Sequence, residues 1–318
     1  MCSCTVLALL APGQGSQTPG MLAPWLELDG TRERVAGWSE LTGLDLVELG
    51  TTADADAIKD TAITQPLVVA LALLAFEELE RRHELPAGML VAGHSVGELA
   101  AAAMAGVLSA DDAVSLAAVR GREMAAACDL APTGMAAVMG GEPEQVVEWL
   151  AEFDLTPANR NGAGQIVAAG ALDAVDKIVA DKPEFVKKII KLKVAGAFHT
   201  RYMEPAREAL REKAAAVTTA NPTRTLLSNA DGEPVATGAE VLDRLVEQVT
   251  RPVRWDSCMA TMTARGVHAL AELPPAGALT GLARRELTDV TIVSLKKPDD
   301  LAKVAAALSD HTDQEASA

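Results

Sequence analysis

A serine between two glycines, in the stretch Gly93-His94-Ser95-Val96-Gly97, is the group whose surroundings could make it a nucleophile. An apolar run at 89–92 precedes it and an alanine-rich helical pattern follows, which predicts a strand, a sharp turn and a helix. Side chains at both glycine positions would collide across so tight a turn, and the free N–H groups at the helix start would point toward an oxyanion. The alternative interpretation is an ordinary strand-to-helix turn.

A serine hydroxyl is a weak nucleophile until a base removes its proton, and five histidines are candidates for that base. His94 adjoins the serine, so its side chain faces elsewhere and is expected to pack beside the strand. His83 and His311 are expected at the surface, and His268 begins a predicted strand. His199 remains, at the point where the chain leaves a predicted inserted domain, and a domain crossing is a usual place for a site. Elimination therefore favours His199.

Two further features could belong to a site. Arg120 lies on a predicted helix over 109–128, near its apolar stripe. A buried arginine requires an anion, whereas an exposed one would pair with Glu123, and the spacing allows both. The loop at 12–17 contains two glycines, but the third glycine of a dinucleotide-binding pattern is missing. We therefore expect a loop whose backbone N–H groups face a neighbouring active site.

Strands that alternate with helices predict the scaffold for these groups, which is typical of a parallel sheet. The expected fold is an α/β-hydrolase-like parallel sheet with an inserted small ferredoxin-like subdomain. The insertion is placed at 131–197, where the elements follow the order β-α-β-β-α-β. The large catalytic domain then comprises 1–130 and 198–318. Among its expected elements are strands at 5–11, 224–228, 267–272 and 290–295 and helices at 32–50, 54–60, 67–80, 204–217 and 241–249, with 252–255 opening a helix over 256–265.

Composition limits the classes of function. The chain has 318 residues and a formal net charge of −16, which argues against nucleic acid as a partner. The apolar run at 5–11 is too short for a signal peptide or a membrane span, so a cytoplasmic protein with a loose polar tail at 309–318 is expected. The cysteines show no paired framework and are expected as free thiols rather than metal ligands: Cys2, Cys4, Cys128 and Cys258.

The chain resembles the malonyl-CoA:acyl-carrier-protein transacylase family of fatty acid synthesis, and it is similar to the acyltransferase domains of polyketide synthases. The resemblance covers about 5–295 and rests on five motifs in the family's order, which together are far more specific than any one of them: Gly13-Gln14-Gly15-Ser16-Gln17, Gly93-His94-Ser95-Val96-Gly97-Glu98, Arg120-Gly121-Arg122, Ala197-Phe198-His199, and Gln248 followed by Pro252-Val253-Arg254-Trp255.

The resemblance implies a role for each matching residue. Ser95 is the nucleophile that becomes acylated, and His199 is the general base and then the acid. Gln248 holds the histidine ring through a carbonyl oxygen, in place of a carboxylate. Arg120 grips the free carboxylate of a malonyl group, because a planar pair of donors suits a carboxylate.

The oxyanion hole and the choice of substrate also follow from the resemblance. The backbone N–H groups of Gln14 and Val96 form the oxyanion hole. In similar domains, malonyl rather than methylmalonyl is selected where phenylalanine precedes the base and an aliphatic residue follows the serine. Phe198 and Val96 match this pattern, and Phe198 would fill the space of an α-methyl group. One methyl group is worth only about 1–3 kcal/mol, so leakage is expected. His94 is also expected to bind substrate, and no metal site is expected.

The expected reaction is a ping-pong transfer of malonyl from malonyl-CoA to the phosphopantetheine thiol of acyl carrier protein, through an ester on Ser95. No cofactor is implied, because phosphopantetheine comes with the partner, and a monomer is expected. Carrier docking would require a basic face on this acidic chain, and a merely solvated face is the alternative. The residues of this expected basic face are Lys182, Lys187, Lys188, Lys191 and Lys193, with Arg201 and Arg207 nearby.

Two other functions remain open. A serine hydrolase or thioesterase would share the turn around Ser95, but it gives no reason for an arginine clamp. A non-catalytic docking module is the second, and the intact Ser95, His199 and Gln248 argue against it. The sequence leaves open whether a carrier protein would belong to fatty acid or polyketide synthesis.

Overall fold

The computed structural model describes residues 6–86 and 88–309, and the strands of one of its two five-stranded sheets all run parallel, which confirms the predicted α/β class. β1 (Val6–Ala11) is the central strand, between β2 (Leu90–Gly93) and β9 (Val267–Glu272), while β7 (Thr225–Leu226) and β10 (Thr291–Ser294) form the edges. The register places the end of β1 opposite the end of β2. The loop after β1 and the turn after β2 therefore meet at one edge of the sheet.

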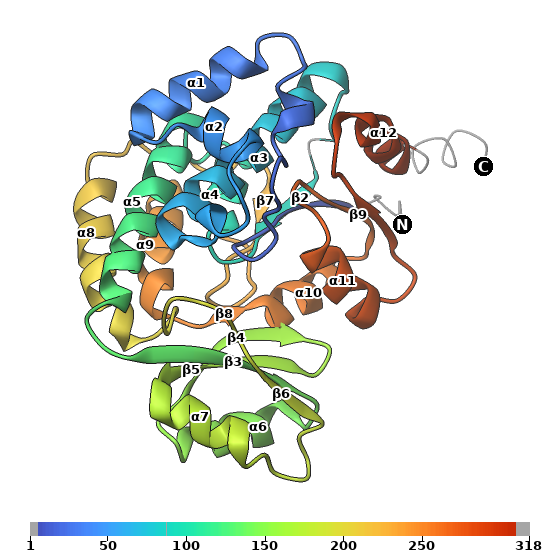
Figure 1. Ribbon diagram of the computed structural model, residues 1–318. Coiled ribbons are helices and arrows are strands. Elements are labelled where there is room, and N and C mark those ends of the chain that lie inside the picture. Colours follow the sequence, from blue (N-terminus) through green and yellow to red (C-terminus); the bar gives the residue numbers. More distant parts are fainter. Residues whose placement is uncertain (1–5, 87, 310–318) are drawn as a thin grey trace.

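Two cores cover the two faces of this sheet. Leu7 and Leu9 join one core and Ala8 and Leu10 the other, because successive side chains of a strand point to opposite faces. Figure 1 shows the larger group of helices on one side and α10 with α11 on the other. The helices are α1 (Thr31–Thr42), α2 (Leu46–Thr51), α3 (Thr61–Arg82), α4 (Gly97–Met104), α5 (Ala110–Cys128), α8 (Glu204–Ala214), α9 (Gly238–Glu247), α10 (Trp255–Ala264), α11 (Ala278–Glu286) and α12 (Leu301–Ser309).

A second sheet lies below the first in Figure 1 and has a core of its own. The chain segment that builds it follows the predicted order β-α-β-β-α-β. Its strand order is β6-β3-β5-β4-β8, and the four strands of the segment pair antiparallel. The elements are β3 (Thr133–Met139), α6 (Pro143–Ala151), β4 (Thr156–Gly162), β5 (Gln165–Ala171), α7 (Leu172–Ala180) and β6 (Lys188–Lys191).

The fifth strand of this second sheet was not predicted. β8 (Val253–Arg254) comes from the later part of the chain and pairs in parallel with Asn159 and Arg160 of β4. The sequence predicts that 252–255 opens a helix, but the helix α10 begins at Trp255. Two residues are too short a run for an alternating pattern to be visible, so this pairing had no signal in the sequence.

Several boundaries also differ. The expected helix over 32–50 is two helices, because Gly43 ends α1 in a left-handed conformation at φ 71°. The expected helix over 54–60 is a short 3-10 turn, Ala57–Lys59. α3 begins at Thr61, where Asp60 caps it, so Pro66 lies inside the helix and not at its start. Cys2, Cys4, His311 and the tail beyond 309 lie outside the described residues.

α3 is the helix on which the larger core is assembled. By length and composition it could cross a membrane, but 83% of its most apolar window is buried inside the protein. Its buried residues include Thr64 and Gln65 among many aliphatic side chains. A helix that is apolar on all sides is expected at the centre of a large protein. It brings the polar Gln65 into the interior, close to the turn after β2.

Candidate active site

The turn after β2 has the predicted geometry of a nucleophile elbow. β2 ends at Gly93, Ser95 has φ 52°, and α4 begins at Gly97. A Cβ atom at Gly93 would lie 2.1 Å from the carbonyl carbon of Gly97, and a Cβ atom at Gly97 would lie 2.4 Å from the carbonyl oxygen of Ala11. Both glycines are therefore required by close backbone approach. The Ser95 N–H donates to Oδ1 of Asn229 at 2.8 Å, which fastens the strained residue from a different part of the chain.

His199 lies beside the serine, as elimination favoured. Its Nε2 is 2.8 Å from Oγ of Ser95, and its Nδ1 is 2.8 Å from the main-chain carbonyl oxygen of Gln248. A carbonyl only accepts, so Nδ1 carries the proton and Nε2 is free to accept the serine proton. Burial, followed by the charge of Arg120, lowers the pKa of His199 to about 3. The ring is therefore neutral at pH 7, in the state that a general base needs.

Arg120 is buried beside this pair, with 2% of its surface exposed. Its Nη1 donates to Oε1 of Gln65 at 2.7 Å, and its Nη2 donates to Oε1 of Gln248 at 2.9 Å and to Oγ of Ser95 at 3.3 Å. Burial lowers its pKa to about 10, so it stays charged at pH 7. Glu123, the alternative partner, pairs with Arg122 instead. No carboxylate in the described part of the chain forms an ion pair with Arg120.

The loop after β1 supplies the other side of the site. Gly13 packs on the main chain of His94, and the side chain of Gln14 donates to Oγ1 of Thr61 at 3.1 Å. Within residues 6–86 and 88–309, neither the N–H of Gln14 nor that of Val96 donates a hydrogen bond to another protein atom. N–H groups without a protein partner beside an activated serine are the arrangement that an oxyanion hole requires.

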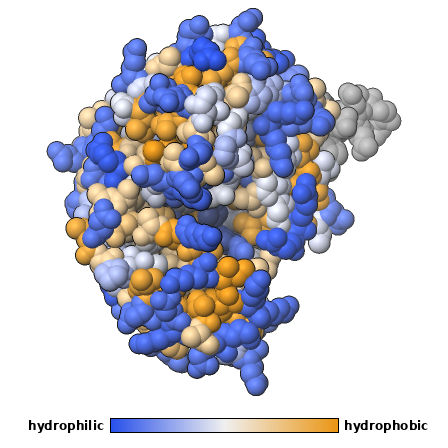
Figure 2. Space-filling model, viewed as in Figure 1, coloured by the Kyte–Doolittle hydropathy of each residue, from blue (hydrophilic) through white to orange (hydrophobic). Residues whose placement is uncertain are grey.

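A cavity of about 330 Å³ opens onto the serine between the two sheets. Figure 2 shows a hollow between the large upper part of the molecule and the smaller lower part. Phe198 and His94 both line the cavity. Nε2 of His94 lies 2.9 Å from Oδ1 of Asn161, its ring meets Trp255 edge-on at 5.6 Å, and burial lowers its pKa. The other lining residues include Met124, Met135, Val167, Val194, Asn159, Gln165, Lys59 and Lys193.

Three buried polar residues of the site were missed by sequence reasoning. Asn229 binds the N–H of Ser95 and also donates to the carbonyl oxygen of Gly93 at 2.8 Å. Gln65 holds Arg120, and Glu98 accepts from the N–H of Asn229 at 3.0 Å. Burial raises the pKa of Glu98 to about 7. A carboxylate in the first turn of a helix is usually expected at the surface. The only sequence signal for a role of Glu98 in the site was its position directly after the elbow motif.

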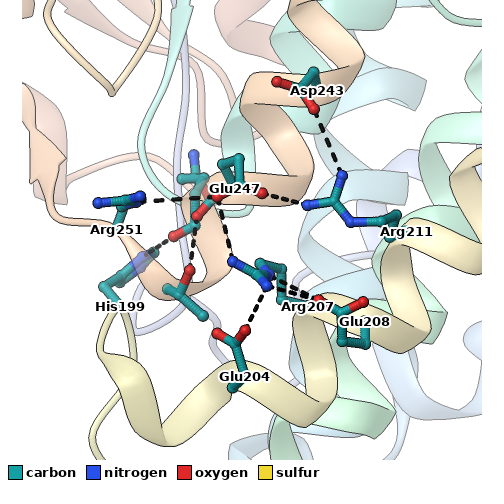
Figure 3. Close-up of polar contacts among 10 residues, drawn as sticks. His199, Glu204, Arg207, Glu208, Arg211, Asp243, Glu247 and Arg251 are labelled. Carbon is teal, nitrogen blue, oxygen red and sulfur yellow. Dashed lines mark hydrogen bonds and ion pairs between the residues drawn. The ribbon is translucent and has the colours of Figure 1, made fainter.

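The carbonyl that holds His199 belongs to a short 3-10 turn, Gln248–Thr250, which charged residues fasten to the rest of the protein (Figure 3). Glu247, directly before it, accepts from Arg207 at 3.5 Å and from Arg211, and lies 4.0 Å from Arg251. Each such partly exposed pair contributes only about 0–1 kcal/mol, but together they tie α8 to α9. Further pairs in this network join Arg211 to Asp243, and Arg207 to Glu204 and Glu208.

The expected basic face is only partly free of acidic neighbours. Arg201 pairs with Asp154, and Arg207 belongs to the network around Glu247. Lys191 pairs with Asp176. The five lysines of the face are exposed, and all of them except Lys191 lack an ion-pair partner in the described part of the chain.

Comparisons with known proteins agree with one another. Residues 9–315 match the family described as acyl transferase domain. The chain is 55% identical over 301 residues to the malonyl CoA-acyl carrier protein transacylase of Mycobacterium tuberculosis (strain ATCC 25618 / H37Rv), covering 94% of this chain and 99% of the relative. It is 33% identical over 304 residues to the malonyl CoA-acyl carrier protein transacylase of Escherichia coli (strain K12), covering 94% and 98%.

Solved structures give the same result. The crystal structure of MCAT from Mycobacterium tuberculosis superposes with a TM-score of 0.91 at 54% identity, covering 94% of this chain and 99% of that one. The acyl-carrier-protein-S-malonyltransferase from Bartonella henselae superposes with a TM-score of 0.89 at 30% identity, covering 95% and 99%.

Proposed function

Because the chain belongs to the malonyl CoA-acyl carrier protein transacylase family and is therefore an acyltransferase, we propose that it transfers malonyl through an ester on Ser95. The donor is malonyl-CoA, and the acceptor is the phosphopantetheine thiol of an acyl carrier protein. One observation carries the proposal: a buried, charged Arg120, which forms no ion pair within the described part of the chain, points its Nη2 at the hydroxyl of Ser95. A carboxylate-bearing acyl group would supply the missing anion.

In the first half of the proposed reaction, Nε2 of His199 takes the proton of Ser95, and Oγ attacks the thioester carbonyl carbon. The developing oxyanion accepts from the N–H groups of Gln14 and Val96, and one such donor is worth roughly 3–4 kcal/mol. The tetrahedral intermediate collapses, the carbon–sulfur bond breaks, and His199 returns its proton to the thiolate of coenzyme A. The carbonyl of Gln248 holds the ring in its tautomer throughout.

In the second half, the thiol of the carrier protein loses its proton to His199 and attacks the ester carbonyl. Ser95 leaves with that proton, and the malonyl thioester is released. Water is the competing nucleophile, so the carboxylate grip of Arg120 also serves to hold the acyl group in place for the thiol. Neither half of the reaction consumes a cofactor. The proposal includes the division of the chain into a large domain, 1–130 and 198–318, and a small one, 131–197.

Substrate selection is proposed to depend on the cavity wall. Phe198 lines the cavity before the base and is 8% exposed, and Val96 is buried after the serine. An α-methyl group on the substrate would need the space that the Phe198 ring fills. The predicted discrimination is modest, since one methyl group is worth about 1–3 kcal/mol.

Intact-mass spectrometry tests the proposal. We expect the mass of one malonyl group on the protein after malonyl-CoA is added, and its transfer when phosphopantetheinylated carrier protein follows. Ser95→Ala is expected to abolish the labelled species, and labelling that survives this substitution would refute the nucleophile. Rapid release of malonate without a carrier protein would favour the serine hydrolase alternative, and absence of any acyl-enzyme would favour the docking module.

A further inference from the structure

Glu98 is a buried carboxyl group directly behind the nucleophile that the proposed mechanism does not use. It is 4% exposed, although it lies in the first turn of α4. One oxygen accepts from the N–H of Asn229 at 3.0 Å, and the other accepts from Nε2 of Gln248. Glu98 is not among the residues that line the cavity. Any effect on substrate must therefore pass through a neighbour.

The side-chain amide of Gln248 is that neighbour, and its two ends face opposite kinds of group. Its Oε1 accepts from Nη2 of Arg120 at 2.9 Å. Its Nε2 faces three acceptors: the carbonyl oxygen of Ser95 at 3.1 Å, Oδ1 of Asn229 at 3.2 Å, and the carboxyl of Glu98. The amide has almost the same shape when turned by 180°. A turned amide would place its NH₂ group against the guanidinium and its oxygen against those acceptors.

We propose that Glu98 is a positioning residue for substrate recognition, because it fixes the direction of the Gln248 amide and thereby keeps Arg120 aimed at Ser95. The carboxyl holds Nε2 together with two neutral acceptors. In its ionised form it is the strongest of the three, since hydrogen bonds to an ionised partner are about twice as strong as neutral ones. This inference rests on the proposed function, in which Arg120 binds the carboxylate of a malonyl group.

Arg120 shows why the direction of one amide matters. Gln65 holds Nη1 and Gln248 holds Nη2, so each terminal nitrogen has one N–H engaged by an amide oxygen. Nη1 keeps a second N–H, and the second N–H of Nη2 faces Oγ of Ser95 at 3.3 Å. A guanidinium binds a carboxylate with two parallel hydrogen bonds. Loss of either amide oxygen would free the guanidinium to turn away from the serine.

Glu98→Gln is the decisive substitution. If the new side chain keeps its oxygen on the N–H of Asn229, its NH₂ group faces Nε2 of Gln248, and the Gln248 amide is driven to turn. We expect the ratio of kcat/KM for malonyl-CoA to that for acetyl-CoA to fall about tenfold, mainly through a higher KM for malonyl-CoA. Acetyl lacks the carboxylate, so its transfer is expected to fall much less.

A neutral fluorophosphonate that labels the active serine reports whether the elbow itself is intact. We expect Glu98→Gln to be labelled at the wild-type rate. The control is Glu78→Gln, which changes another buried carboxylate, paired with Arg81 and Arg82 at the end of α3, and should leave the ratio unaltered. If Glu98→Gln fails to fold, Glu98→Asp is measured instead; its shorter carboxylate cannot reach both partners, and a smaller fall in the ratio is expected.

The outcomes separate this inference from the proposed function. An unchanged ratio in a folded variant would overturn the positioning role, and so would an equal loss of malonyl and acetyl transfer. Wild-type protein that loads no malonyl group would instead overturn the proposed function, and the inference would fall with it. A selective loss of malonyl transfer with intact fluorophosphonate labelling supports it.

Discussion

Two residues of the site hold a left-handed backbone conformation that side chains rarely adopt: Ser95 at φ 52° and His199 at φ 61°. Such residues cost about 1–3 kcal/mol each and persist only where the surroundings hold them. Oδ1 of Asn229 accepts from the N–H of Ser95, and the main-chain carbonyl of Gln248 accepts from the ring of His199. With both residues held in this way, Oγ and Nε2 lie 2.8 Å apart, within hydrogen-bond distance.

Replacement of Arg120 tests the carboxylate clamp at the same scale. Arg120→Ala should lower kcat/KM for malonyl-CoA by about a hundredfold, because a buried charge-assisted contact is lost, and should raise acetyl transfer. Steady-state kinetics with both donors measure the change. Arg122→Ala removes the exposed neighbour that pairs with Glu123 and is expected to have no effect. Unchanged malonyl preference in Arg120→Ala would contradict the clamp.

The pH dependence of stability offers an independent test of Glu98. Burial raises its pKa from 4.5 to about 7 in the folded protein, so ionisation is disfavoured by folding. Below pH 4.5 the carboxyl is protonated in both states; as the pH rises to 7 the folded protein loses stability relative to a variant without this group. The free energy of unfolding of Glu98→Gln minus that of wild type should therefore rise by about 3 kcal/mol across this window.

Urea unfolding at pH 5 and pH 8 provides this measurement. Glu78→Gln is a control of opposite sign: burial would raise the pKa of Glu78, but its hydrogen bonds to Arg81 and Arg82 outweigh burial and lower it. If the free energy of unfolding of Glu98→Gln minus that of wild type does not change with pH, folding leaves the pKa of Glu98 at its ordinary value.

The sequence could name the reacting residues but not the ones that hold them. Ser95 stood in a local motif, and His199 could be reached by elimination among five histidines. Spacing could not decide whether Arg120 is buried or exposed, because the apolar pattern of one helix does not show how deeply a neighbouring helix covers it. Asn229, Gln65 and Glu98 act through contacts with residues 55 to 150 positions away, and such contacts leave no periodic trace.

At the scale of elements, the elbow depends on close passage of two strand ends. Gly97→Ala would place a methyl group against the main chain of β1, which cannot move without disturbing the central strand. We expect a loss of about 3 kcal/mol in the free energy of unfolding and loss of Ser95 labelling. Thermal unfolding and intact-mass spectrometry with malonyl-CoA measure the two effects.

The matched control is Gly37→Ala in α1, where an added Cβ meets nothing within 4 Å. It should stabilise the protein by about 0.5–1 kcal/mol, because glycine in a helix is costly. Equal behaviour of the two variants would show that the tight approach at Gly97 is tolerated.

Element boundaries were predicted where local chemistry sets them. Asp45 and Ser109 cap α2 and α5 through their side chains, and Ser109 had been predicted as a cap. The break at Gly43 was missed, because apolar periodicity continues across it. The start of α3 at Thr61 was missed, because a proline is typical of a first helical turn and Pro66 was placed there. β8 was missed for a different reason: its pairing partner lies in the inserted segment, far away in the sequence.

At the scale of the molecule, we expect a carrier protein to dock on this acidic chain through a local basic region. Reversing the charge of Lys187 and Lys188 to glutamate should raise the KM for the carrier protein several-fold, with malonyl loading of Ser95 unchanged. The effect should shrink as salt is added. Arg32→Glu, on α1 at the opposite end of the molecule in Figure 1, is the control. An unaltered KM would mean that these lysines form only a solvated surface.

The strand β8 sets a rule for protein engineering. It begins five residues after the 3-10 turn begins at Gln248, yet it completes the sheet of the inserted segment. In a chimera that exchanges 131–197 for the segment of another enzyme, β4 would come from that enzyme and β8 from this chain. The two strands would then have to pair although they come from different proteins. A recombination boundary that also carries 252–256 keeps that pairing native, together with the Trp255 ring beside His94.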